Sequence, residues 1–143
     1  MLVLSEEQII LRDMVKSWVA DRASISALRT VRTVHANVGF DPKLYREMGE
    51  MGWSGIVIPE AVVGVDMGWV SFGLIAEELG RNLTASPLLS SLACAASAIM
   101  LGDNEEQKHA LLPAIADGSL VATLAVDSGH HHRPSVISTT ARL

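Results

Sequence analysis

The stretch PLLSSLACAASAIML, which runs from Pro87 to Leu101, decides the fold that we expect for this sequence. It carries no charged residue, serine is its only hydroxyl-bearing type, and Gly102 follows it. A helix that is apolar on every side belongs in a protein interior, and this run is shorter than the roughly 20 residues that cross a bilayer. Ser86 can cap the first free amides, and Pro87 suits the first helical position. The stretch is therefore predicted to be a buried central helix.

Small side chains fill much of this run and allow a close approach to its backbone, either by neighbouring helices or by a long, thin ligand. From the residues alone, tight packing among helices is the more common explanation. Cys94 lies in the run and is the only cysteine of the sequence, so it cannot form an intrachain disulfide. A free thiol in an apolar helix fits a reducing cytoplasm.

Composition and charge exclude several classes of protein. With 143 residues, 49% of them hydrophobic, the chain is long enough for one domain with a substantial core. Its net charge of −5 offers no basic footprint for nucleic acid or for an anionic membrane surface. The first residues lack a secretory signal, and no segment is long enough for a membrane span, so we expect a cytoplasmic protein.

Helical spacing and capping signals predict further helices on both sides of the central run. Ser5 and the three residues after it have the form of a capping box. Residues 22–40 show weak periodicity and are expected to form a loop with some helix. The helices are expected over about 5–21, from Asp41 toward Gly49 or Gly52, over 69–83, and from Asp103 to Asp117-Gly118, with a break or kink at Pro113.

Beyond Gly118 the pattern changes from helical to strand-like. Residues 120–126, LVATLAV, form a continuous apolar run and are predicted to be a buried strand. Residues 135–143 are rich in β-branched side chains and indicate a second strand. Because two strands alone are marginally stable, we interpret residues 1–118 as a helical domain and residues 119–143 as the first two strands of a truncated β-domain.

Three adjacent histidines, His130 to His132, are the most evident candidates for a metal site, since imidazole often binds zinc. Neighbouring side chains in an extended chain point to alternate faces, so three in a row do not easily converge on one ion. A solvated or partner-facing loop is favoured, and no metal site is predicted. The preceding Asp127-Ser128-Gly129 fits a ligand contact and a simple turn equally well.

Four stretches of the sequence share their order and character with one known family. They are LYREMGEMGWSGIVIPE at 44–60, SFGLIAEELGRNL at 71–83, LGDNEEQKHALLPAIADGSL at 101–120 and VISTTARL at 136–143. Together they resemble the N-terminal part of the acyl-CoA dehydrogenase family. The resemblance covers nearly the whole chain from Ser5 onward.

This resemblance implies a mainly α chain, with an acyl-CoA dehydrogenase N-terminal-like helical domain followed by the start of a β-barrel-like middle domain. It also implies FAD as cofactor, an acyl-CoA as substrate, a separate electron acceptor and a homo- or hetero-oligomer. Such enzymes oxidise the Cα–Cβ bond: a carboxylate removes the α-proton while hydride passes from Cβ to the flavin N5. The family's base lies in a C-terminal bundle, so no residue here is predicted to be catalytic. The 143-residue chain alone is expected to be inactive.

The resemblance further implies which residues bind ligands. The helix that matches residues 87–101 lines part of the family's acyl pocket, which makes Leu89 and Ala93 wall residues and places Ser86 near the entrance. Small and apolar side chains there suit an acyl tail.

Four residues fall at the family's flavin positions. Leu124 and Val126 match positions that pack on or bind the flavin ring. Asp127 replaces a threonine that donates to the ring, and an ionised carboxylate can only accept. His132 lies where the family has a Gly-Ser-Asp segment. Two alternatives stay open: a flavin-degenerate subunit of a heteromeric acyl-CoA dehydrogenase, and a non-enzymatic helical interaction module.

Overall fold

The computed structural model describes residues 3–133 and 135–140, and the described part contains helices and no strand. The mainly α fold predicted from the sequence is therefore confirmed. η1 and η2 are 3-10 turns and η3 is a π-helix. In chain order the elements are α1 (Glu6–Arg22), α2 (Ile25–Val34), α3 (Pro42–Glu50), η1 (Trp53–Gly55), η2 (Glu60–Val62), α4 (Gly68–Arg81), η3 (Leu89–Ala96), α5 (Ser97–Leu101) and α6 (Glu105–Ala116).

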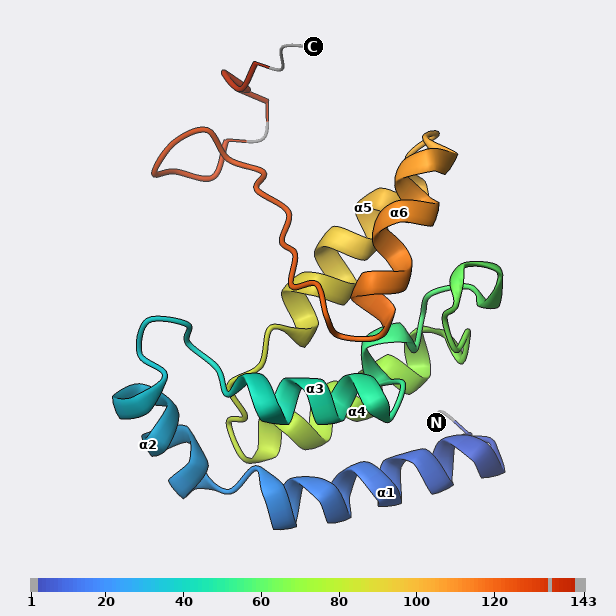
Figure 1. Ribbon diagram of the computed structural model, residues 1–143, viewed down its shortest axis with the longest axis vertical. Helices are drawn as coiled ribbons and strands as arrows, with labels where there is room; N and C mark the ends of the chain where they lie inside the picture. Colours follow the sequence, from blue (N-terminus) through green and yellow to red (C-terminus); the bar gives the residue numbers. More distant parts are fainter. Residues whose placement is uncertain (1–2, 134, 141–143) are drawn as a thin grey trace.

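The helices pack in two connected groups (Figure 1). α1 packs along α4, and α3 contacts η1. α6 contacts η1, η2, η3 and α5, so it joins the second half of the chain to the first. The chain that follows α6 leaves the helices as an extended segment, drawn in orange and red in Figure 1.

The buried run at residues 53–58 forms the centre of the core. Trp53 and Ile58 are fully buried, and the Trp53 ring meets Trp18 edge to face with a centroid distance of 5.1 Å. The Ser54 hydroxyl donates to the carbonyl oxygen of Ala116 across 2.9 Å in the interior. An irregular segment, held by α1 on one side and α6 on the other, therefore occupies the position that we expected for the central helix.

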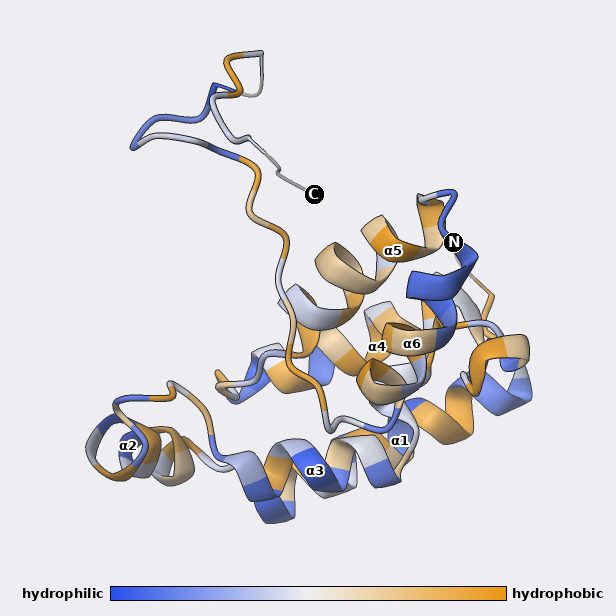
Figure 2. Cartoon of the chain, turned by 45° about the horizontal axis from the view of Figure 1, so that its top comes forward, coloured by the Kyte–Doolittle hydropathy of each residue, from blue (hydrophilic) through white to orange (hydrophobic). Residues whose placement is uncertain are grey.

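The stretch from Pro87 to Leu101 is buried on one side only, so the prediction of a helix buried all round is wrong. Leu92 is fully buried in this stretch, whereas Leu89 is 62% exposed and Leu101 85% exposed. The reason is that α6 and η1 cover just one side of η3 and α5. In Figure 2 the helical ribbon of this part of the chain has mostly the tan and orange colours of apolar residues.

The two ends of the fold test the capping predictions. The Ser5 side chain accepts from the Gln8 amide and the Gln8 side chain accepts from the Ser5 amide, which confirms the capping box. The helix that was expected to begin at Asp103 begins later, because α6 starts at Glu105. Asn104 is the N-cap, and its side chain accepts from the amide of Gln107 at 3.0 Å.

Two other segments differ in the structure from what the sequence predicted. α2 occupies ten residues of the segment that was expected to be mainly a loop. α6 runs through Pro113 to Ala116 without the predicted break. A proline costs a helix one hydrogen bond, and the burial of Leu112 and Ile115 on either side offsets that loss.

Residues 120–126 are extended, but they form no strand and are not buried. Leu124 is 48% exposed and Val126 51% exposed, so the predicted buried strand is wrong. A strand needs a hydrogen-bonded neighbour, and no backbone ladder joins this segment to residues 135–140 within the described part. The end of the second predicted strand, residues 141–143, lies outside the described residues, and the boundary between residues 118 and 119 stays a prediction.

The backbones of α3 and the end of α6 meet without space for a side chain between them. A Cβ atom at Gly49 would collide with the carbonyl oxygen of Asp117. Gly118 follows with a φ of +77°, a conformation that favours glycine. Gly49 and Gly118 therefore allow the backbone of α3 to lie directly against the backbone at the end of α6.

Gly49→Ala is expected to destabilise the protein by about 1–3 kcal/mol, because the methyl group would force α3 and α6 apart. Gly73→Ala in α4 is the matched control, since a Cβ atom there meets nothing within 4 Å. The control is expected to be neutral or to stabilise by about 0.5–1 kcal/mol. Urea unfolding followed by far-ultraviolet circular dichroism measures both variants. A free energy of unfolding for Gly49→Ala equal to that of the wild type would contradict the close approach.

Tyr45 brings a polar group into this core. Its ring is buried, and its hydroxyl has no hydrogen-bond partner among the described residues. Burial raises the pKa of Tyr45 above the ordinary value of 10.0, and the nearby Ser91 hydroxyl offsets part of that rise. The folded protein therefore holds this proton more tightly than the unfolded chain does.

We expect the stability that this phenol contributes to be present below about pH 10 and lost as the pH rises through the raised pKa of the folded state. Tyr45 is the only tyrosine of the sequence, so the ultraviolet absorbance of tyrosinate reports on it alone. Tyr45→Phe, the control, should lose this alkaline decline in stability. A folded chain whose tyrosine ionises at the ordinary pKa would refute the prediction.

Candidate functional site

An apolar groove lies between α4 and the start of η3. Its cavity volume is about 250 Å³, and no ionisable side chain lines it. Such a lining suits an aliphatic or polycyclic group better than a charged one. The lining residues are Phe72, Ala76, Leu79, Gly80, Leu83, Thr84, Ser86, Leu88 and Leu89.

Two of the three predicted acyl-binding residues lie in this groove. Ser86 is at the turn before η3, where its hydroxyl oxygen accepts from the Leu88 amide at 3.1 Å. Leu89 is exposed at the groove wall and can lose that exposure when an apolar ligand binds. Ala93 does not line the groove but packs, partly buried, against the core.

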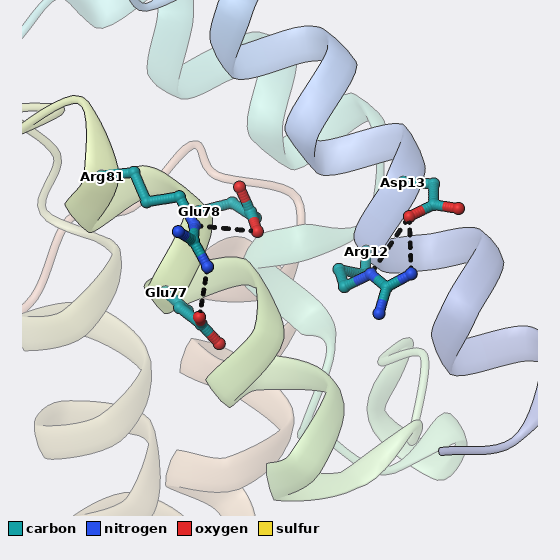
Figure 3. A network of polar contacts seen from close by, with 5 residues as sticks. All are labelled: Arg12, Asp13, Glu77, Glu78 and Arg81. Atoms are coloured by element: carbon teal, nitrogen blue, oxygen red, sulfur yellow. Dashed lines mark hydrogen bonds and ion pairs between the residues drawn. The ribbon is translucent and has the colours of Figure 1, made fainter. Parts of the chain in front are cut away.

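Both carboxylates on α4 pair with one arginine of the same helix. Arg81 donates to Glu77 at 2.6 Å and to Glu78 at 3.1 Å, as Figure 3 shows. Glu78 is only 6% exposed, so its pairing matters more than that of a surface carboxylate. Figure 3 also shows a similar local pair on α1, between Arg12 and Asp13 at 2.9 Å. Glu77, Glu78 and Arg81 carry two negative charges and one positive charge, and none of the three lines the groove.

The predicted flavin-contact residues lie on the extended segment that follows α6. Asp127 and His132 are brought together: His132 Nδ1 is 3.0 Å from Asp127 Oδ2, and the Arg133 amide donates to Asp127 Oδ1 at 3.0 Å. Both carboxylate oxygens are thus engaged within this loop. Leu124 and Val126 precede the loop, and both have exposed side chains.

The histidines do not converge on one point. His132 turns to Asp127, while His130 and His131 line a shallow depression of about 210 Å³ beside Arg133. Within residues 3–133 and 135–140, no group of three or more His, Cys, Asp or Glu side chains is placed to hold a metal ion.

Ser91 is a residue that the sequence interpretation missed. It is fully buried in η3, and its hydroxyl both donates to the Ala122 carbonyl and accepts from the Ala122 amide, each at 3.1 Å. The buried hydroxyl of Tyr45 has no hydrogen-bond partner in the described part. A serine on the inward side of an apolar helix was the signal that could have identified it.

The groove and the extended segment therefore form two separate parts of a candidate site. η3 supports both, because its first residues line the groove and Ser91 binds the segment. Among the described residues, no helix combines the length and apolar character needed to cross a membrane.

Comparison with known proteins matches this arrangement to one family. The family model for the acyl-CoA dehydrogenase N-terminal domain matches residues 5–119. The acyl-CoA dehydrogenase FadE12 of Mycobacterium tuberculosis is 34% identical over 142 residues, which cover 96% of this chain and 35% of the relative. The chain thus spans about a third of the length of the curated relatives that it matches.

Solved structures agree with this match. A variant of the Tcur3481-Tcur3483 steroid ACAD is 32% identical, with a TM-score of 0.76, over 87% of this chain and 34% of that one. An acyl-CoA dehydrogenase complexed with FAD, from Bacillus anthracis, is 26% identical, with a TM-score of 0.66, over 83% of this chain and 20% of that one. This chain belongs to the acyl-CoA dehydrogenase family, and its residues 5–119 correspond to the family's N-terminal domain.

Proposed function

We propose that this chain is part of an FAD-dependent acyl-CoA dehydrogenase that oxidises the Cα–Cβ bond of an acyl-CoA thioester to the enoyl-CoA. The observation that carries the proposal is the uncharged groove between α4 and η3, in a chain whose residues 5–119 match the family's N-terminal domain. The groove would hold the acyl group, and the extended segment would contribute to flavin binding. Assembly into a homo- or hetero-oligomer and electron transfer to a separate acceptor belong to the same proposal.

The groove supports an apolar acyl group as its ligand. Leu89 and Leu83 are exposed at its wall, and burying a leucine side chain is worth roughly 1.5–3 kcal/mol. Ser86 adds a hydroxyl at the start of η3. Since a structure named as a steroid ACAD is among the relatives, a bulky polycyclic acyl-CoA and a straight-chain one are the first two substrates to compare.

The residues of the extended segment fit a flavin ring through their apolar side chains. Leu124 and Val126 are exposed and can cover one face of the ring. Asp127 accepts from the Arg133 amide and lies against His132, so the carboxylate holds the loop rather than donating to a ligand. With Nδ1 facing Asp127, the other ring nitrogen of His132 is a donor only when the imidazole is protonated. When FAD is bound, it accepts the hydride that the acyl group loses.

The first test is the visible absorption spectrum of the protein purified from its complete reading frame, with and without its genomic neighbour co-expressed. Flavin bands in the single protein are the expected result, and an acyl-CoA substrate screen then follows. Bands that need the neighbour would indicate a site shared between unlike subunits. The absence of flavin in both preparations would contradict the enzyme proposal and favour an interaction module.

Leu89→Glu is expected to raise the KM for acyl-CoA about tenfold or more, because it places a charge where the apolar tail would lie. Leu101→Glu is the matched control: Leu101 is an exposed leucine of the same helical run and does not line the groove. Both variants should keep the wild-type Tm, since both positions are already exposed. Equal KM values for the two variants would remove the groove from the proposed site.

A further inference from the structure

One side chain joins the helix beside the groove to the extended segment. The hydroxyl of Ser91, in η3, donates to the carbonyl oxygen of Ala122 and accepts from its amide, both at 3.1 Å. Ser91 is 0% exposed. A single buried hydroxyl thus satisfies both backbone groups of one residue that is 31 positions away in the sequence.

Ala122 is the last point at which the segment is held before the proposed flavin residues. The Leu120 amide donates to the Ala114 carbonyl in α6 at 2.8 Å, and Ser91 then holds Ala122. Among the described residues, Thr123–Val126 make no hydrogen bond. The direction in which the segment continues therefore depends on the Ser91 contact.

Because side chains alternate along an extended chain, the position of Ala122 also determines the face on which Leu124 and Val126 lie. Leu120 and Ala122 pack, partly buried, against the core, so the side chains at these two positions face the helices. In an extended chain, side chains two residues apart share a face and lie about 7 Å apart. Leu124 and Val126 continue the face that Ser91 fixes, at about 7 Å and 13 Å beyond Ala122.

Ser91 also lies near the groove, because residues of the same helix that line the groove precede it by two or three positions. Leu88 precedes it by three residues and lines the groove, and Leu92, which follows it, is fully buried in the core. A shift of η3 would move the groove wall and the segment together. The other two serines of the run do not have this role. Ser90 donates to the Pro87 carbonyl at 2.9 Å and Ser97 to the Leu92 carbonyl at 3.3 Å, so both bond within the same helical run.

We propose that Ser91 is a positioning residue, which fixes the segment carrying Leu124 and Val126 relative to the acyl groove. The inference rests on the proposed function, in which that segment contributes to flavin binding. Ser91 touches neither ligand; it acts through the backbone of Ala122.

The test compares Ser91→Ala with Ser90→Ala in the protein from its complete reading frame. Ser91→Ala should weaken FAD binding about tenfold, because both backbone groups of Ala122 lose their partner. Ser90→Ala removes a hydroxyl one position away and should keep the wild-type affinity. FAD affinity is measured by flavin fluorescence, with the Tm of each apoprotein as the folding control. Ser91→Thr restores a hydroxyl and should recover FAD affinity at least in part.

Hydrogen exchange followed by mass spectrometry gives a second readout that does not need flavin. The peptide covering residues 119–126 should exchange faster in Ser91→Ala than in the wild type and in Ser90→Ala. Unchanged FAD affinity in Ser91→Ala, or an equal loss in both alanine variants, would overturn the inference while leaving the proposed function intact. A wild-type protein that binds no FAD would instead refute the proposed function.

Discussion

The contact between the end of α6 and the α3–η1 region is the constraint on which the rest of the structure depends. It combines a buried hydrogen bond, from Ser54 to the Ala116 carbonyl, with a backbone approach at Gly49 that leaves no room for a side chain. Hydrogen bonds in a dry interior are costly to leave unmade, so both segments must stay in register. Trp53 fills the space beside them and connects α1 to the same centre through Trp18.

This contact also decides where the candidate site lies. Because the end of α6 is fixed, the chain that leaves it starts from a defined point, and the Leu120 amide still binds back to α6. η3 packs against α6 and η1 on its inner side and lines the groove with its first residues on the other. The groove and the extended segment are therefore positioned by one framework, although neither is part of the core.

The sequence predicted best the features that neighbouring residues determine. The capping box at Ser5 needs only residues within one helical turn, and it was recognised correctly. The uncharged composition of residues 87–101 gave no information about which side is covered, because no charged residue marks the outer face. It therefore indicated a buried helix, whereas burial depends on α6 and η1, which lie elsewhere in the sequence.

The residues that line the candidate site were predictable to a similar extent. The family resemblance pointed to Ser86 and Leu89, which the structure places together in the groove, and to Ala93, which it does not. The link between Ser91 and Ala122 could not be inferred from spacing, because its two members are 31 positions apart and only the folded chain brings them together. Likewise, the apolar run 120–126 has the composition of a strand but, within the described residues, lacks the neighbour that would make it one.

The hydrogen bonds between Ser91 and Ala122 hold the start of the extended segment in a way that differs from ordinary strand pairing. A sheet normally begins when two strands pair. Here the Ser91 hydroxyl, in η3, makes the two hydrogen bonds to the Ala122 backbone that a neighbouring strand would otherwise make. The next peptide groups, from Thr123 to Val126, make no hydrogen bond among the described residues and already have an extended shape. Their backbone N–H and C=O groups are unpaired among the described residues, so another strand can pair with them along this edge.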